Sequence, residues 1–378
     1  MKKLYLLLCT SAITTSLAAQ FVPETTHCRM DSMLMIGYHP DGSSHNKFVY
    51  TYDGNDYLIG TDIYSKQEIF GALPGEWMHQ LRMTFTNTSS GQPLSSTSSV
   101  MNDEAGGWMD MEKTTYEYDA NGNCLKKEEY SLSWDPATAS LGLVLSSTNT
   151  YSYDDQNRIL ESHLVQYGMP NREYKYVYSY GAFGLESDSY YNLEEGEWVL
   201  SNVSECAYDE QGSMIRETNK YPYDGQWYYT SCQTFTYDEN GNMLTSVYSN
   251  GCQTDYSLLN PATITNYTYD EKGRVTLEEV FDPYNEGVVT NRTISAYDDH
   301  DDLVSQTNYN QDYDPITWEP LPDLKLHEEL YFYYKCLSGS SMAQIYAKPE
   351  QRGCILMNGK LVIFSGDKYY DLMGRSIK

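Results

Sequence analysis

FTYDENGNML, residues Phe235–Leu244, aligns without a gap on YEYDANGNCL, residues Tyr116–Leu125. Both stretches carry two aromatic residues separated by one residue, then Asp, then Asn-Gly, then an apolar pair. Asp hydrogen-bonds its own backbone in turns, and Asn-Gly accepts the positive φ angles that tight hairpin turns require. Alternation before the turn places the aromatic rings on one face of a strand. Each stretch therefore predicts a β-hairpin whose return strand opens with the apolar pair.

The same pattern recurs along most of the chain. With the second aromatic residue as marker, the copies are separated by 27 to 36 residues, a period of about 31. The markers are at positions 52, 85, 118, 153, 180, 208, 237, 269, 297 and 333, of which Phe85, Tyr180 and Tyr333 belong to weaker copies. A lone hairpin is marginally stable in water, so the copies must stack. The sequence predicts an all-β fold of about ten tandem β-hairpin repeats, forming an extended, twisted antiparallel sheet or a partial shell, plus a small C-terminal β module.

The N-terminus has the composition of a secretory signal peptide. Met1–Lys3 is positively charged, Leu4–Ile13 is apolar, and Ser16–Ala19 offers small residues for cleavage. A membrane helix needs about 20 apolar residues, and this run is shorter. We expect export to the extracellular space or the outer-membrane surface, with the periplasm as the alternative, and no membrane span in the mature chain.

Four parts are predicted along the chain. They are a signal peptide (1–19), an N-terminal segment (20–49), the repeat domain (50–334) and the C-terminal β module (335–378). The last boundary depends on charge, because the module holds seven Lys and Arg against three Asp and Glu, whereas the preceding residues hold 18 against 50. Two apolar runs split by Asn358-Gly359 predict a hairpin in this module.

Composition restricts the possible partners. The chain has 53 Asp and Glu against 25 Lys and Arg, a formal net charge of −28. Nucleic acid and anionic membrane surfaces would be repelled. Tyrosine accounts for 38 of the 378 residues, and such aromatic content is typical of folded chains. The partner we expect is a glycan or a protein.

Cysteine usage leaves the redox state open. Seven cysteines remain without Cys9, so at least one is unpaired or bonds to another chain, and the pairing is not determined. The spacing is not that of a zinc site. Cys124 and Cys206 replace apolar or aromatic residues of other repeats, which favours small core residues over ligands or nucleophiles.

Two of the turns are candidates for calcium binding, because they present carboxylate and amide oxygens at alternate positions. Their residues are Asp119, Asn121, Asn123, Asp238, Asn240 and Asn242. Hairpin turns select the same residues for backbone reasons, and the bidentate Glu of an EF-hand loop is missing. We therefore favour the turn interpretation and keep calcium as an alternative; no other cofactor is expected.

Three tryptophans are candidates for ligand binding. Trp108, Trp198 and Trp227 each lie ten residues before a marker tyrosine and follow a Gly-containing loop. Their flat faces could stack on sugar rings or cations. The alternative is that the aromatic residues only form the core of a thin sheet.

The sequence favours a non-enzymatic protein. The seven His are scattered, and no metalloprotease, nucleophile-elbow or phosphate-loop motif occurs. Three pairs of adjacent acids occur, at Glu194-Glu195, Glu278-Glu279 and Glu328-Glu329. The two members of each pair would point to opposite faces of a strand, so they could not act together on one glycosidic bond.

The repeated unit Tyr-x-Tyr-Asp-x-x-Gly-x-Leu resembles the YD repeats of Rhs and teneurin-type proteins over roughly residues 50–334. Those proteins are secreted or surface polypeptides whose repeats build a β-shell. The tail from Asn358 to Lys378 is similar to the opening of C-terminal sorting domains of the type IX secretion system of Bacteroidetes-type bacteria. That resemblance implies passage across the outer membrane and surface attachment.

These observations predict an exported, non-enzymatic scaffold for binding or adhesion to glycan or protein. Two alternatives stay open. One is an exported polysaccharide-active hydrolase whose carboxylates come from distant repeats, which requires two carboxyl groups about 5–9.5 Å apart. The other is a calcium-stabilised structural protein of the cell envelope.

Overall fold

The computed structural model describes residues 28–336 and 352–377, apart from short internal segments. The segments outside the description are 40–41, 70–74, 103–105, 136–138, 254–255, 285–286, 314–319, 358–359, 366–367 and 371–375. The predicted signal peptide and much of the C-terminal tail lie outside the described residues. The two compact units are residues 1–335 and 336–378.

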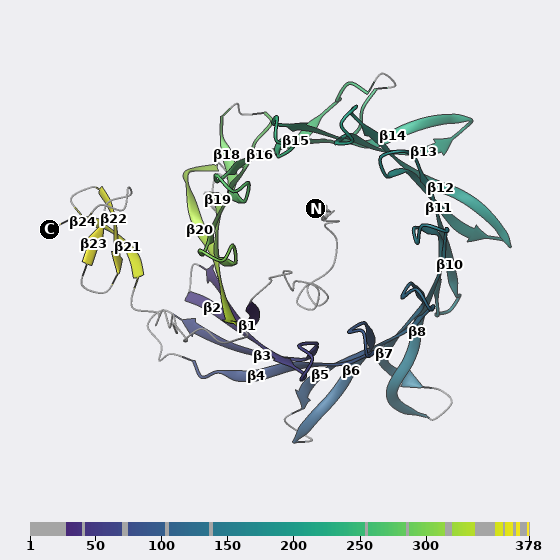
Figure 1. Ribbon diagram of the computed structural model, residues 1–378, viewed down its shortest axis with the longest axis horizontal. Helices are drawn as coiled ribbons and strands as arrows, with labels where there is room; N and C mark the ends of the chain where they lie inside the picture. The colour runs from purple at the N-terminus through teal and green to yellow at the C-terminus, as the bar shows by residue number, and fades with distance from the viewer. Residues whose placement is uncertain are drawn as a thin grey trace. The chain divides into compact units, whose positions relative to one another are not determined.

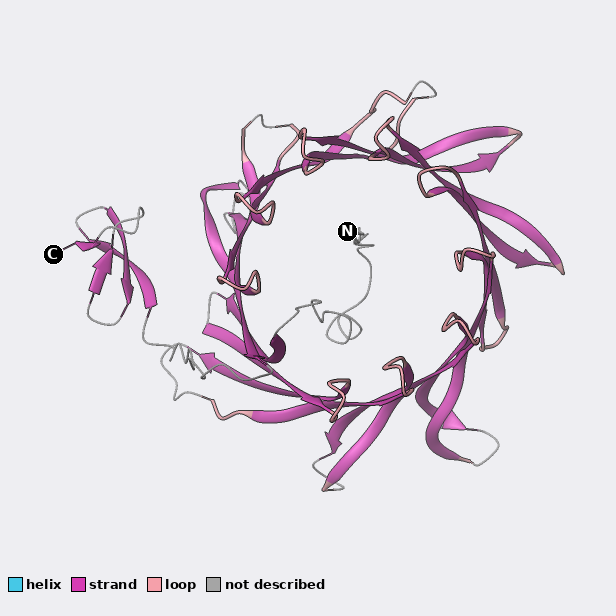
Figure 2. Ribbon diagram, in the orientation of Figure 1, coloured by secondary structure: helices cyan, strands magenta, loops and turns pink. Residues whose placement is uncertain are grey.

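The described residues of the first unit form twenty β-strands. They are β1 (Cys28–His39), β2 (Gly42–Tyr52), β3 (Leu58–Ile69), β4 (Met78–Asn87), β5 (Pro93–Asn102), β6 (Gly107–Tyr118), β7 (Cys124–Asp135), β8 (Ser140–Tyr153), β9 (Ile159–Gln166), β10 (Arg172–Tyr180), β11 (Leu185–Glu194), β12 (Glu197–Tyr208), β13 (Met214–Tyr223), β14 (Gln226–Tyr237), β15 (Met243–Ser249), β16 (Pro261–Tyr269), β17 (Val275–Phe281), β18 (Val289–Tyr297), β19 (Leu303–Tyr313) and β20 (Pro320–Cys336). Figure 2 shows that strands and turns make up the unit. No described helix is long and apolar enough to span a membrane.

Each strand pairs with its neighbours in the chain, and β1 also pairs with β20. The sheet is therefore closed into a 20-stranded antiparallel barrel, which Figure 1 shows as a ring. The predicted all-β fold of stacked hairpins is confirmed. The sequence left open whether the sheet is extended or wraps into a partial shell, and the structure closes it completely. The sheet also begins at Cys28, so β1 and most of β2 lie in the segment that the sequence placed before the repeats.

The turn chemistry is as predicted. Asp119 Oδ1 accepts hydrogen bonds from the backbone N–H groups of Asn121 and Asn123, both at 2.8 Å. Gly122 adopts φ = 85°, which a residue without Cβ accepts at little cost. Six further turns repeat this arrangement, at Asp53, Asp154, Asp209, Asp238, Asp270 and Asp298. All follow an even-numbered strand, so they lie at one rim of the barrel, the short-turn rim.

Most marker tyrosines hydrogen-bond to the preceding repeat. Tyr153 at the end of β8 donates its hydroxyl hydrogen bond to the carbonyl of Cys124, the first residue of β7, at 2.7 Å. We call this contact the tyrosine clamp. It recurs at Tyr52, Tyr118, Tyr208, Tyr237, Tyr269, Tyr297 and Tyr334, with oxygen–oxygen distances of 2.7–3.1 Å.

The clamp corrects two marker positions. Tyr334, not Tyr333, donates to Leu303, and the Asn87 side chain, not Phe85, reaches the carbonyl of Leu58 at 2.8 Å. Phe85 instead takes the place of the first aromatic residue in the pattern, as Tyr116 does before Tyr118. An amide N–H replaces the tyrosine hydroxyl at position 87, so an aromatic-based marker could not find it.

The described part of the barrel has no extended apolar core. Its nearly inaccessible apolar side chains are Met30, Val203, Cys232 and Cys252. A larger set of nearly inaccessible side chains is polar, among them Ser162, Ser204, Ser246 and Thr265. The sheet is a single layer, and these small side chains lie between larger neighbours on adjacent strands, as Ser162 does opposite Tyr151 and Tyr176. Cross-strand pairs therefore take the role of a core.

The two faces of the sheet differ in burial. Tyr116, Tyr118 and Cys124 share one face, the tyrosine face, where they are half-buried. Leu125 points the opposite way and is 42% exposed, and Leu94, Leu160, Ile215 and Leu244 resemble it. Side chains converge on the concave side of a closed sheet and diverge on the convex side. The tyrosine face is therefore the inner face and the leucine-bearing face the outer one.

The second unit contains β21 (Arg352–Met357), β22 (Lys360–Ser365), β23 (Lys368–Tyr370) and β24 (Ser376–Ile377). They form an antiparallel sheet in that order. Ile355 pairs with Val362 and Leu356 with Leu361, which is the predicted hairpin.

Candidate functional site

The predicted tryptophans lie on the outer face, each against a basic side chain. The Arg82 guanidinium lies 4.5 Å from the Trp108 ring centroid, and the His79 ring packs edge-on against the same indole at 4.5 Å. Arg82 is further held by Asp62, which accepts from its Nε at 2.8 Å. The Trp108 indole is half-buried and contacts partners from β4. It is therefore less available for a ligand than the sequence suggested.

Trp198 has the same kind of surroundings. The Lys175 ammonium lies 4.9 Å from its ring centroid, and His163 packs edge-on at 5.4 Å. His163 Nε2 is 3.0 Å from a carboxylate oxygen of Glu173. An indole, an ammonium, an imidazole and a carboxylate thus meet on the outer face of β9–β12.

Trp227 is the most exposed of the three, at 44%. The Lys220 ammonium lies 4.7 Å from its ring centroid and 2.7 Å from a carboxylate oxygen of Glu205. Cation–π contact of this kind contributes about 0.5–1 kcal/mol at exposed sites and also holds the ring in one orientation.

A fourth member of this set was missed from the sequence. Trp77 is 42% exposed, and the Lys66 ammonium lies 5.2 Å from its ring. It follows Gly75-Glu76 and lies ten residues before Asn87, so it has the spacing of the other three. The assignment of Phe85 as marker concealed that spacing.

The tip of the β13–β14 hairpin carries the densest group of exposed aromatic rings. Tyr221, Tyr223, Trp227 and Tyr228 are exposed by 37%, 64%, 44% and 43%. Tyr228 stacks on Tyr221 and contacts Tyr223 edge-on, both with centroids 5.7 Å apart. The hairpin extends outward from the ring (Figure 1), and its turn at Asp224-Gly225 has positive φ at both residues, as a two-residue type I′ turn requires. We call these four residues the aromatic tip.

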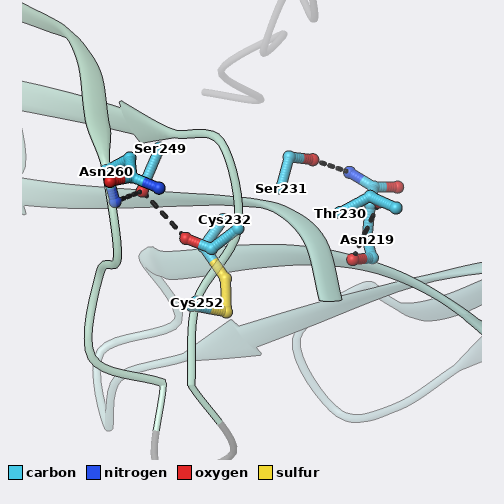
Figure 3. The surroundings of a disulfide bond; sticks show 8 residues. Asn219, Thr230, Ser231, Cys232, Ser249, Cys252 and Asn260 are labelled. Atoms are coloured by element: carbon cyan, nitrogen blue, oxygen red, sulfur yellow. Dashed lines mark hydrogen bonds between the residues drawn. A yellow bond between two sulfur atoms is a disulfide. The ribbon is translucent and has the colours of Figure 1, made fainter. Parts of the chain in front are cut away.

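The loop after β15 covers part of the outer face beside this hairpin. Cys252 forms a disulfide with Cys232, which is 1% exposed (Figure 3). The Asn260 backbone N–H donates to Ser249 Oγ at 3.2 Å, and the Tyr256 ring lies 3.7 Å from the Arg216 guanidinium carbon. The sequence left the cysteine pairing open. Among the described cysteines, Cys124 and Cys206 are free and half-buried.

In the two turns considered for calcium, internal hydrogen bonds occupy the carboxylates. Asp119 Oδ2 accepts from Asn123 Nδ2 at 2.9 Å, in addition to the two backbone bonds to Oδ1. Asp238 and Asn242 repeat the contact at 2.9 Å. Hydrogen bonds from Asn123 hold the pKa of Asp119 below its usual range, and those from Asn242 do the same for Asp238. Within the described residues no three His, Cys, Asp or Glu side chains gather as a metal centre. Calcium binding by Asp119, Asn121, Asn123, Asp238, Asn240 and Asn242 stays a prediction.

The inner face carries a hollow of about 510 Å³ across β3–β8. Ser96 and Ser98 of β5 form its floor, between Phe85 of β4 and Tyr116 of β6. In other repeats the comparable small residues, Ser162 and Ser246, are covered by their neighbours. Glu129 lines the hollow too, but Lys127 and Ser147 bind its carboxylate and hold its pKa low against the effect of burial.

A second group of titratable side chains lies on β11–β13. Burial raises the pKa of Asp188, and the negative charge of Glu217 adds to the effect. Burial also raises the pKa of the Cys206 thiol to about 11, with contributions from Glu217 and Asp188. The carboxylate of Asp188 thus lies within the electrostatic influence of Glu217 and is a weaker acid than an exposed Asp.

Comparisons with known proteins give structural similarities at low identity. A porin-like protein from Bacteroides uniformis matches at 12% identity and a TM-score of 0.33, over 81% of this chain and 98% of that protein. A protein of unknown function from Bacteroides fragilis matches at 15% identity and a TM-score of 0.20, over 40% of this chain and 88% of that one. A TcdB2–TccC3 structure matches at 12% identity and a TM-score of 0.14, over 93% of this chain and 27% of the other. No protein-family model and no curated protein matches.

Proposed function

We propose that this chain is an exported, non-enzymatic scaffold that binds a glycan or a protein through aromatic side chains on its outer hairpins. The signal-peptide pattern of residues 1–19 supports export. The resemblance to YD repeats and to a type IX sorting tail supports a place at the cell surface.

The aromatic tip is the observation that carries the proposal. Four large aromatic side chains within eight positions are each more than a third exposed, although few apolar side chains are buried in the described part of the barrel. The three tyrosines pack on one another and Trp227 packs against Lys220, and exposed aromatic groups of this kind are typical of binding sites. Because Tyr221 already stacks on Tyr228, less side-chain conformational entropy is lost when a ligand binds.

A neutral glycan fits this site best. Aromatic faces accept the apolar faces of sugar rings, and Lys220 and Glu205 beside Trp227 can bond to hydroxyl groups. The net charge of −28 would repel acidic polysaccharides. Repetition of the indole and cation pair at Trp77, Trp108 and Trp198 would suit a ligand with repeated units, since linked sites raise the apparent affinity.

A glycan array with the mature chain tests the proposal. Trp227→Ala and Tyr223→Ala should each weaken binding of the recognised glycan by about tenfold or more, as expected for residues at the centre of a site. Trp134→Ala is the matched control, because Trp134 is 61% exposed on the β7–β8 hairpin and makes no ring contact among those described. All variants should melt as the wild type does.

Two results would count against glycan binding at the aromatic tip. One is a wild-type chain that binds no glycan, which would leave a protein partner as the remaining form of the proposal. The other is an equal loss in Trp134→Ala and Trp227→Ala, which would indicate nonspecific adsorption to exposed indoles. The three tryptophans named from the sequence should also differ, with Trp108→Ala affecting stability more than binding.

The alternative of a polysaccharide-active hydrolase has one specific observation in its favour. Burial and the nearby charge of Glu217 raise the pKa of Asp188, and a carboxyl group with a raised pKa is what a general acid requires. The wild-type chain and Asp188→Asn would be compared on polysaccharide substrates. Hydrolysis that disappears in the variant would establish the alternative, whereas no hydrolysis by the wild type would remove it.

A further inference from the structure

One short turn departs from a hydrogen-bond pattern that four others share. In the Asp119 and Asp238 turns, the residue four positions later is Asn, and its amide donates to the free Asp oxygen at 2.9 Å. In the Asp154 and Asp270 turns that residue is Arg, and its Nε donates to the same oxygen at 2.6 and 2.7 Å. The turn aspartate thus has a donor beside its second oxygen in all four cases.

The turn between β18 and β19 has an acid at this position. Asp302 follows Asp298 by four residues, and its backbone N–H donates to Asp298 Oδ1 at 3.0 Å, so the backbone of the turn is unchanged. A carboxylate cannot replace the amide or guanidinium as a donor. This turn therefore has a second carboxylate, whose pKa the charge of Asp298 raises, where those four turns have a donor.

Asp302 is deeply buried and incompletely bonded. Its exposure is 3%, and its Oδ1 has no hydrogen-bond partner. A buried carboxylate without a partner is costly, and further acids at Asp298 and Asp301 increase the cost. Burial, followed by the charge of Asp298, raises the pKa of Asp302.

The nearby cations are directed to another carboxylate. Arg274 Nη1 donates to Asp301 Oδ1 at 2.8 Å, and Lys272 bonds to the same oxygen. His300 is exposed, with Nδ1 3.8 Å from Asp298 Oδ2. On the β20 side the titratable group that interacts with Asp302 is Tyr334, a hydroxyl whose pKa is raised by burial and further by the charge of Asp302. The charge of His300 offsets the effect of the neighbouring acids on Asp302 only in part, since burial and Asp298 outweigh it and the pKa of Asp302 stays raised.

We propose that Asp298 and Asp302 bind a Ca²⁺ ion. Calcium prefers carboxylate oxygens and completes its six to eight ligands with backbone carbonyls and water, so two carboxylates suffice for a weak site of the extracellular class, with Kd about 10⁻⁴–10⁻³ M. The ion would supply the positive charge that the Arg side chain supplies in the Asp154 and Asp270 turns. This site differs from the turns named from the sequence, whose carboxylates already have donors, and it is independent of glycan binding.

Calcium-dependent melting of the full mature chain tests the site. After removal of metal, addition of CaCl₂ to about ten times the expected Kd should raise the Tm saturably by about 2–4 °C, whereas MgCl₂ and NaCl of equal ionic strength should not. Asp302→Asn recreates the Asp119/Asn123 pair, so this variant should melt above the wild type in chelator and show no response to calcium.

Matched variants keep the test decisive. Asp299→Asn removes the same charge from an exposed position in the same turn and should keep the calcium response. Asp298→Asn preserves the turn acceptor but removes one proposed ligand, so it should lose the response even if Asp302→Asn fails to fold. An unchanged wild-type Tm in calcium would overturn the proposal, and so would an equal loss in Asp299→Asn. A wild type that is stabilised by mild acid but not by calcium would show that Asp298 and Asp302 share a proton instead.

Discussion

Removal of one tyrosine hydroxyl measures what the clamp contributes. Tyr153→Phe and Tyr269→Phe each delete a 2.7 Å hydrogen bond to a backbone carbonyl, at Cys124 and Met243, and leave the aromatic ring in place. A net hydrogen bond contributes about 0.5–1.5 kcal/mol, and an unsatisfied carbonyl can add to the loss. We expect each variant to lose about 1 kcal/mol of unfolding free energy.

The double variant tests whether the clamps act separately. Tyr153 is on β8 and Tyr269 on β16, and they share no hydrogen-bond partner. Losses at distant, independent sites add to within about 0.5 kcal/mol, so the double variant should lose about 2 kcal/mol. Urea unfolding followed by tryptophan fluorescence gives the midpoint and the slope, from which the free energies follow.

Tyr180→Phe is the control that the chain itself provides. Tyr180 occupies a marker position, but its described contact is the Arg158 guanidinium 4.5 Å from the ring, which phenylalanine retains. This variant should unfold within about 0.5 kcal/mol of the wild type. If Tyr180→Phe loses as much as Tyr153→Phe, the hydroxyl bond is not what the marker position supplies, and the reasoning fails.

Three further predictions concern pH, backbone conformation and redox state. Burial raises the pKa of Tyr50 and Tyr151 to about 12, so the native state favours the neutral form of both side chains. Their contribution to the unfolding free energy is complete below about pH 10 and is lost as the pH rises toward 12. An alkaline titration that follows tyrosinate absorbance and unfolding together should show this loss. Gly241→Ala should lower the unfolding free energy measured in urea by about 1–2 kcal/mol, because φ is 78° at this position although a Cβ would have space. Gly142→Ala, where a Cβ would also have space, should leave the unfolding free energy unchanged. Reduction of Cys232–Cys252 should lower the unfolding free energy by about 2–4 kcal/mol, and Cys252→Ala should make the chain insensitive to reductant.

Local structure was predictable from the sequence because it depends on neighbouring residues. The Asp and Gly positions fix the turns, and alternation fixes which side chains share a face with Tyr116. Two markers were misplaced for the same reason, since the pattern recognises aromatic rings whereas the clamp needs only a hydrogen-bond donor. Asn87 supplies one without a ring, and at the end of β20 Tyr333 and Tyr334 are both aromatic, so only the contact to Leu303 distinguishes them.

The candidate site was predictable in kind but not in detail. The spacing identified Trp108, Trp198 and Trp227, but their exposure depends on side chains from other strands. Arg82 and His79 cover Trp108 from β4, and no local pattern in the sequence connects them to it. The exposed neighbours of Trp227, by contrast, lie within its own hairpin.

Closure of the barrel follows from the repeat itself once the role of β1 is considered. Each repeat is an outgoing strand that ends at a clamp residue, a turn and a return strand, yet among the described residues no return strand of the barrel follows Tyr334. β1 pairs with β20 in that place, and the carbonyl of its Met30 accepts from Tyr52 as the first residues of other return strands accept from theirs. On the other side of β1, the Tyr38 hydroxyl bonds to Glu329 of β20. The tenth hairpin is thus divided between the two ends of the sheet. β1, which lacks the aromatic pattern, therefore completes the last repeat of the chain. Closure of the barrel depends on a pairing between residues some 300 positions apart, and no local motif in the sequence could reveal such a pairing.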